Sequence, residues 1–171
     1  QIVITGDDKQ LKPNDLYSNR WEDGDEDDAI FQVDSLLDFA GLNLEKTSLT
    51  GHYRSEIPEL IQFSNNSFYE GKLSYMPSLE SLNGKISAIE YVKVDGKWKD
   101  GVNPTEADKV VEMLKVFIWS GQKSIGVVTF NSKQQELIQD KLEEKAISDG
   151  WNIPDELFVK NIENVQGDER D

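Results

Sequence analysis

The sequence contains no cysteine and only one histidine, His52, which limits the metal and redox chemistry open to it. Without thiols the chain forms no disulfide and no thiolate metal site, and one imidazole does not make a histidine cluster. Long apolar runs are also missing, so no segment is predicted to cross a bilayer, and none has the pattern of a secretory signal. These absences favour a cytoplasmic protein.

Basic residues are scarce as well. Lysine and arginine number 18 against 33 aspartates and glutamates, which leaves a net charge of -15. Proteins that bind nucleic acid by charge alone usually carry a basic face, so this balance argues against a simple electrostatic binder. Much of the acidity lies in residues 22–28 (EDGDEDD). This run is interpreted either as a cation site or docking loop or as a solvated surface insertion, and mutual repulsion favours the insertion.

Strand patterns and helix patterns alternate along the 171 residues, a length sufficient for one compact domain. Because a parallel strand pair needs a long crossover connection, this alternation predicts an α/β domain with a parallel sheet. The apolar run 125–130 is typical of a central strand covered on both faces. The predicted strands are residues 1–5, 47–50, 86–94, 125–130 and 157–162, and the predicted helices are residues 28–40, 57–68, 104–118 and 132–146.

Helix boundaries carry local signals. Asn103 is a predicted N-cap, Pro104 suits the first helical position, and Glu106 can reach back to the cap. Ser132 and Gln135 resemble a second capping box. Glycines are predicted to stop three of the helices: Gly41, Gly71 and Gly121.

Three polar clusters follow predicted strands, and ligands of open α/β sheets gather at the carboxyl ends of the strands. Gly6-Asp7-Asp8-Lys9-Gln10 follows the first strand, and the Gln10 amide can orient a water molecule or sense a phosphate. His52-Tyr53-Arg54-Ser55 follows the second, where Tyr53 offers a flat face for a base and Arg54 a rigid fork for phosphate.

The third cluster is Gln166-Gly167-Asp168-Glu169-Arg170-Asp171. Gly167 allows close backbone approach, and Glu169 can accept hydrogen bonds from a sugar hydroxyl. Taken one at a time, the first and third clusters are better explained as charged turns. Arg54 is equally well explained by a surface ion pair.

Together the clusters resemble superfamily 1 DNA and RNA helicases, whose motifs G-D-x-x-Q, Y-R and Q-G-x-E-x-D occur in this order. The matching residues here are 6–10, Tyr53-Arg54 and 166–171. Residues 126–131 (GVVTFN), followed by Gln134, resemble the family segment that touches the nucleic-acid backbone. The ending Gln10-Leu11-x-Pro13 resembles the branch of nonsense-decay, splicing-type and replication-type helicases.

The resemblance implies a RecA-like, P-loop NTPase-type fold, which is a three-layer domain with a mostly parallel central sheet. Residues 1–13 would end the first RecA-like domain. Residues 14–44 would connect it, through the acidic insertion and a helix, to the second motor domain at 45–171, incomplete at its C-terminus. The partners implied are ATP with Mg²⁺ and single-stranded nucleic acid, DNA or RNA.

The resemblance also implies roles at the nucleotide. Gln10 would lie near the γ-phosphate, Tyr53 would stack on the adenine, and Arg54 would reach the γ-phosphate across the cleft. Gly167 and Glu169 would contact ribose or phosphate. Gln10, Arg54 and Glu169 are therefore expected to converge on one rim of the sheet.

Nucleic-acid contacts are implied at three further positions. Thr129 and Asn131, at a helix start, would hold a phosphate, since free backbone N–H groups and the helix dipole favour an anion there. Asn161 stands where a threonine often contacts nucleic acid in the family, and Lys12 stands where many members have proline.

The sequence has no G-x-x-x-x-G-K-[ST] phosphate loop, and the acidic magnesium motif and the final arginine motif are missing too. In the family the first two precede the matched region and the last follows it, so we expect a fragment of a larger motor without ATPase activity of its own. One alternative is a non-catalytic RecA-like binding module. Another is a metal-dependent nuclease built on the acidic run, with Asp23, Asp25, Glu26 and Asp27.

Overall fold

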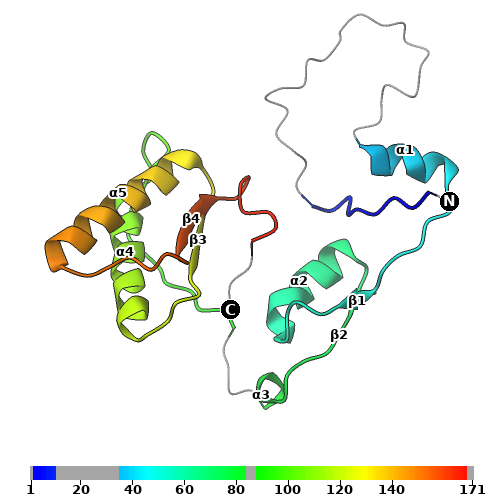
Figure 1. Cartoon of the computed structure of the whole chain (residues 1–171), viewed down its shortest axis with the longest axis horizontal. Coiled ribbons are helices and arrows are strands. Elements are labelled where there is room, and N and C mark those ends of the chain that lie inside the picture. Colours follow the sequence, from blue (N-terminus) through cyan, green and yellow to red (C-terminus); the bar gives the residue numbers. More distant parts are fainter. Residues whose placement is uncertain (1, 11–34, 84–87, 169–171) are drawn as a thin grey trace, which may run out of the picture. The chain divides into compact units, whose positions relative to one another are not determined.

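The computed structural model describes residues 2–10, 35–83 and 88–168. They belong to two compact units, residues 1–91 and residues 92–171 (Figure 1). The boundary between the units differs from the predicted domain boundary near residue 45, which stays a prediction. The acidic run at 22–28 lies outside the described residues.

The first unit contains short elements. They are α1 (Leu36–Asn43), β1 (Gly51–His52), α2 (Pro58–Phe68), β2 (Ser74–Tyr75) and α3 (Leu79–Leu82). Strands β1 and β2 pair in parallel, with Gly51 opposite Ser74 and His52 opposite Tyr75. The pairing continues to Thr50, whose carbonyl accepts from the Ser74 N–H at 2.8 Å. The strand predicted at 47–50 is therefore displaced to the residues that follow it.

Ser35 caps helix α1, and its hydroxyl oxygen accepts from the Asp38 N–H. The prediction that Gly41 ends this helix is wrong, because α1 continues to Asn43 and the Leu44 N–H closes it on the Ala40 carbonyl. Residues 28–34 of the predicted helix lie outside the described residues. The prediction for α2 is confirmed: it begins with Pro58 and is followed by Gly71, which has a left-handed φ of 71°.

Two predicted strands are wrong. Residues 2–5 and residues 88–94 have no strand pairing in the described part of the chain, and Ile2 and Val3 are 78% and 75% exposed. An apolar run becomes a strand only where another strand supplies its hydrogen bonds, and local composition does not supply that partner.

The second unit is an α/β layer. It contains α4 (Pro104–Trp119), β3 (Gly126–Thr129), α5 (Ser132–Asp149) and β4 (Phe158–Asn161). The two helices lie side by side in Figure 1, and α5 packs against both strands. The core between them is made of small and branched apolar side chains: Ala107, Val111, Leu114, Ile138, Leu142 and Val159.

Local capping signals set both helix starts in this unit. Asn103 caps α4 by accepting from the Glu106 N–H at 3.2 Å, as predicted. The second capping box is shifted by one residue, because Asn131 rather than Ser132 caps α5. The Asn131 side chain accepts from the Gln134 N–H at 2.8 Å, which leaves Ser132 as the first helical residue.

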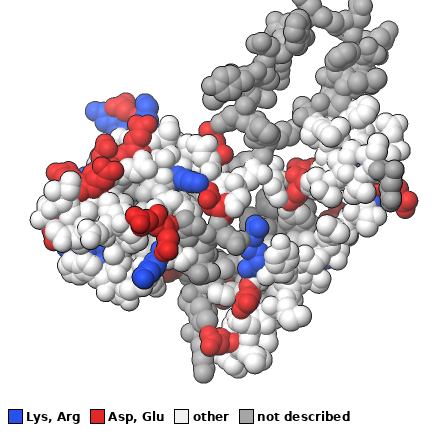
Figure 2. Space-filling view, viewed as in Figure 1, with Lys and Arg blue, Asp and Glu red and all other residues white. Residues whose placement is uncertain are grey.

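Strands β3 and β4 pair in parallel, so the predicted parallel direction is confirmed for this pair. The prediction that β3 is covered on both faces is wrong for the described residues, because Val128 is 51% exposed. Helix α5 contacts both strands. On the face shown in Figure 2, acidic and basic side chains are interspersed. Across the described ranges, no helix combines the length and apolarity needed to span a membrane.

Candidate functional site

The carboxyl ends of β3 and β4 bring two predicted site residues together. Thr129 is register-paired with Asn161, and the two are only 7% and 6% exposed. Because parallel strands present their carboxyl ends at one edge, the segments that follow them start from the same place. The sequence predicted nucleic-acid contacts for these two residues, and the fold places them side by side.

Internal hydrogen bonds hold this edge in place. The Thr129 hydroxyl donates to the Asn131 carbonyl at 2.8 Å, and the Asn131 amide donates to the Gly101 carbonyl at 3.1 Å. The Asn161 side-chain oxygen accepts from the Asn164 N–H at 3.0 Å. The edge is therefore preformed beside the N-terminus of α5, where the helix dipole is positive and favours an anion.

A tight turn that sequence reasoning missed lies against the same edge. Lys99 and Val102 form a two-residue antiparallel bridge around Asp100 and Gly101, whose φ angles are 54° and 87°. Lys133, in the first turn of α5, donates to the Asp100 carbonyl at 3.3 Å. The pair Asp-Gly is a recognised signal for such a turn and could have revealed it.

The segment after β4 turns back toward that strand. The Ile162 N–H extends the parallel ladder by donating to the Thr129 carbonyl at 2.8 Å, a turn closes where the Asp168 N–H donates to the Val165 carbonyl at 3.0 Å, and Asp168 is paired with Lys160 of β4. Gly167 has a left-handed φ of 92°, so a glycine suits the turn. Glu169 lies outside the described residues, so its convergence with Gln10 and Arg54 stays a prediction.

In the first unit, the Gly6–Gln10 cluster is a turn organised by Asp7. The Asp7 carboxylate accepts from the Lys9 N–H at 3.0 Å and from the Gln10 amide at 3.3 Å. It also accepts from the Tyr69 hydroxyl, 62 residues away, at 2.7 Å. Burial opposes the charged form, but the bonds from Tyr69, Lys9 and Gln10 outweigh it and lower the Asp7 pKa. Tyr69 was missed as a site residue, because nothing local in the sequence points to Asp7.

The second cluster follows β1 as predicted. His52 Nε2 accepts from the Ser55 N–H at 3.0 Å, which bends the chain around Tyr53 and Arg54. Tyr53 is 88% exposed, so its ring is open to a planar ligand. The roles of Tyr53 and Arg54 at a nucleotide stay predictions.

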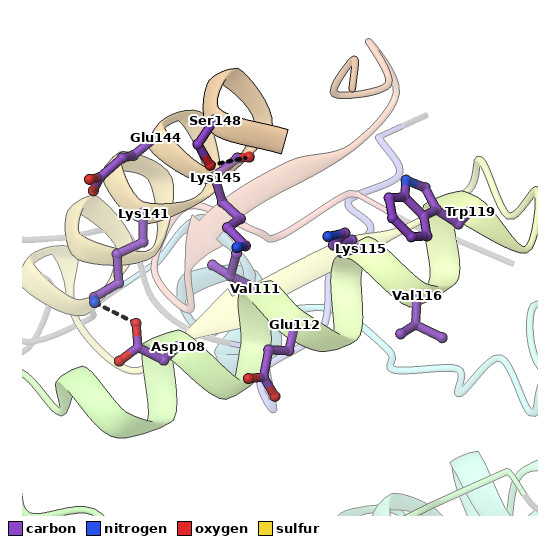
Figure 3. A pocket seen from close by; sticks show the side chains of 10 residues that line it. All are labelled: Asp108, Val111, Glu112, Lys115, Val116, Trp119, Lys141, Glu144, Lys145 and Ser148. Carbon is purple, nitrogen blue, oxygen red and sulfur yellow. Dashed lines mark hydrogen bonds and ion pairs between the residues drawn. The ribbon is translucent and has the colours of Figure 1, made fainter. Parts of the chain in front are cut away.

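A groove of about 940 Å³ lies between α4 and α5, and the motif residues do not line it. Its charged lining is balanced, with three basic and three acidic side chains. Figure 3 shows Lys141 of α5 pointing to Asp108 of α4, and Lys141 Nζ lies 2.5 Å from Asp108 Oδ1. Lys115 is paired with Asp149 and lies 4.3 Å from the centre of the Trp119 ring. A groove whose lysines are already neutralised is poorly suited to phosphate.

Within residues 2–10, 35–83 and 88–168, no group of three or more histidines, aspartates and glutamates is arranged to hold a metal ion. The four acidic residues proposed for a nuclease lie outside these ranges.

Comparison with known proteins decides the family. The family model described as "AAA domain" matches residues 34–171. The chain belongs to the AAA domain family. An AAA domain and the parallel α/β layer of the second unit fit a P-loop NTPase fold. No solved structure matches this AAA domain chain significantly.

Two curated relatives align with this AAA domain chain over its whole length. One is named "Uncharacterized ATP-dependent helicase MG140 homolog", from Mycoplasma pneumoniae, and is 36% identical over 190 aligned positions. The other is named "Uncharacterized ATP-dependent helicase MG140", from Mycoplasma genitalium, and is 35% identical. The chain spans 17% of the length of each relative.

Proposed function

We propose that this chain is a segment of an ATP-dependent superfamily 1 helicase. It would contain the end of the first RecA-like domain and most of the second, in a three-layer arrangement. The observation that carries the proposal is the pairing of Thr129 with Asn161, which joins two separate helicase-like segments at one sheet edge. The names of the two relatives, both ATP-dependent helicases, support it.

In this proposal, Gln10, Tyr53 and Arg54 act on ATP, and Gly167 and Glu169 contact its ribose or phosphates. A phosphate loop, which this sequence does not contain, would hold most of the nucleotide and its Mg²⁺ in the complete protein. Gln10 would couple hydrolysis to domain closure, and Arg54 would stabilise charge on the γ-phosphate. Repeated opening and closing of two RecA-like domains would move the motor along single-stranded nucleic acid.

The sheet edge is the proposed contact to nucleic acid. Thr129 and Asn161 are buried and hydrogen-bonded within the chain, so they hold the shape of the edge. Asn131 caps α5, whose positive N-terminus would face a backbone phosphate. Phosphate is common to DNA and RNA, so these contacts would not by themselves select one of the two.

The proposal is tested by replacing Arg54 in the complete protein. Arg54→Ala should lower the rate of ATP hydrolysis by about 10³-fold, the scale of an arginine finger, while single-strand binding stays within about twofold. Lys93→Ala, which removes an exposed cation, is the matched control and should leave both unchanged. Unchanged hydrolysis by Arg54→Ala would overturn the role assigned to this residue.

A second measurement separates the motor from its runner-up, a non-catalytic binding module. The chain by itself should show no ATPase activity, because it has no loop to hold the β- and γ-phosphates. Robust metal-dependent turnover by the purified chain would contradict the proposal. A complete protein that lacks a phosphate loop upstream of this region would favour the module.

A further inference from the structure

Tyr69 is held by a rigid turn at the end of α2. The Asn65 side chain is 6% exposed and bonds both to the Leu73 N–H at 2.9 Å and to the Leu73 carbonyl at 3.1 Å. The Asn65 carbonyl accepts from the N–H groups of Tyr69 and Gly71, at 3.1 and 2.9 Å. These bonds fix the backbone at Tyr69, so its phenol lies in a defined position.

The phenol reaches the turn that contains Gln10. The Tyr69 hydroxyl donates to Asp7 Oδ2 at 2.7 Å, and the Gln10 amide donates to the same oxygen at 3.3 Å. The other carboxylate oxygen, Oδ1, accepts from the Lys9 N–H. Both ends of the carboxylate are thus engaged, which sets its rotation and the direction from which Gln10 approaches it.

The two bonds to Oδ2 differ in strength. An O–H donor at 2.7 Å to a carboxylate is a short, charge-assisted bond, whereas an amide at 3.3 Å is near the long limit. Tyr69 is therefore the firmer anchor of the Asp7 carboxylate, and Gln10 is its weaker partner there.

We infer that Tyr69 is a positioning residue that orients the Gln10 side chain through the Asp7 carboxylate. The inference rests on the proposed function, in which Gln10 senses the γ-phosphate. It adds a link between two segments of the helicase-like pattern, because α2 follows the Tyr53-Arg54 cluster along the chain. Movement of α2 would then alter the orientation of Gln10.

The geometry is tested on this chain by NMR. Tyr69→Phe removes only the hydroxyl, and it should shift the Gln10 side-chain amide resonances, which are identified by their absence from Gln10→Glu. Tyr91→Phe removes a phenol from a residue that is 85% exposed and should leave them in place. Gln10 resonances that are identical in Tyr69→Phe and the unmodified chain would overturn the inference.

The consequence is tested by kinetics in the complete protein. Tyr69→Phe should lower kcat for ATP hydrolysis by about fivefold, the loss of one ordinary hydrogen bond, with little change in KM. Combining Tyr69→Phe with Asp7→Asn should cost less than the product of the two single effects, because both act through one carboxylate. A merely structural role for Tyr69 would lower the amount of folded enzyme and leave kcat per folded molecule unchanged.

Gln10→Ala separates the two levels of the proposal. If it abolishes hydrolysis while Tyr69→Phe has normal kcat, the inference fails and the proposed function stands. If Gln10→Ala hydrolyses ATP normally, the proposed role of Gln10 fails. In that case the NMR comparison of Tyr69→Phe with the unmodified chain still tests whether Tyr69 orients the Gln10 side chain.

Discussion

Gln134 exchanges two hydrogen bonds with the main chain of Asn103, and this exchange joins the start of α5 to the start of α4. The Asn103 N–H donates to Gln134 Oε1 at 2.8 Å, and Gln134 Nε2 donates to the Asn103 carbonyl at 3.2 Å. Gln134 is 1% exposed and Asn103 is 4% exposed. The two helices therefore keep a defined register next to the sheet edge that we propose as the nucleic-acid contact.

Removing this link should destabilise the second unit. Gln134→Ala leaves the buried Asn103 N–H without its partner, whereas the Asn103 carbonyl keeps the Ala107 N–H, so we expect the free energy of unfolding to fall by about 1–3 kcal/mol. Urea titration followed by circular dichroism measures the change. Gln122→Ala, at an exposed position after α4, is the control and should keep the original midpoint. Equal midpoints for the two variants would mean that the buried bonds contribute little.

The ion pair between Lys160 and Asp168 should hold the segment that contains Gly167. Lys160 Nζ lies 2.5 Å from Asp168 Oδ2, and the side chains of Lys160 and Asp168 are 36% and 28% exposed. For a partly exposed pair we expect Lys160→Met to cost only about 0.5–1 kcal/mol of global stability. The local effect should be larger, with faster hydrogen exchange at the Asp168 N–H.

Charge reversal provides a sharper test of that pair. The double variant Lys160→Asp with Asp168→Lys should recover slow exchange at residue 168, whereas each single reversal should not. Lys109→Met, which removes an exposed pair with Glu112, serves as the control. Rapid exchange in the double variant would show that the segment does not depend on the pair.

Tyr69 should ionise late in an alkaline titration. Its hydrogen bond to Asp7, with a smaller contribution from burial, raises the pKa of Tyr69 from 10.0 to about 12. Because the folded state holds this proton more tightly than the unfolded state, the stabilisation is complete below pH 10 and is lost as the pH rises toward 12. Tyrosinate absorbance should show a late step that disappears in Tyr69→Phe and persists in Tyr91→Phe. If the unmodified chain shows no late tyrosinate step, the hydrogen bond from Tyr69 to Asp7 is contradicted.

Asp149 should remain charged in acid. Hydrogen bonds from Lys115 and then from Lys145 lower the pKa of Asp149 from 3.8 to about 2. The folded state therefore favours the carboxylate, and the stabilisation is present above pH 3.8 and is lost as the pH falls toward 2. Lys115→Met should raise the Asp149 pKa in a carboxyl NMR titration, and Lys109→Met should not. If the Asp149 pKa is the same in both variants, Lys115 is not the main cause of its lowered value.

Helices α2, α4 and α5 were predictable because their signals are local. Periodic apolar residues mark one face of each helix, and Asn103, Pro104 and Gly71 mark boundaries through backbone geometry that each residue favours by itself. The shift from Ser132 to Asn131 as the cap of α5 is small, since both residue types can cap. Strands β3 and β4 were predictable for a related reason, because each is a short apolar run that alternates with a helix pattern along the chain.

The predicted strands at 1–5 and 86–94 show where local evidence stops. Ile2 and Val3 have the composition of a buried strand, yet in the described residues they are exposed and unpaired as strands. Strand formation requires backbone hydrogen bonds from a second segment, and the residues of a strand do not show whether such a segment lies beside it.

The amino-acid sequence by itself determined the α/β class, the capped helices and the order of the helicase-like motifs, since each depends on residues close together in the chain. Tertiary structure alone decided that Tyr69 bonds to Asp7, that Gln134 bonds to Asn103 and that Thr129 lies opposite Asn161. These contacts join residues separated by 31 to 62 positions. Many side chains could have made them, and only the packing of the elements selects which ones do.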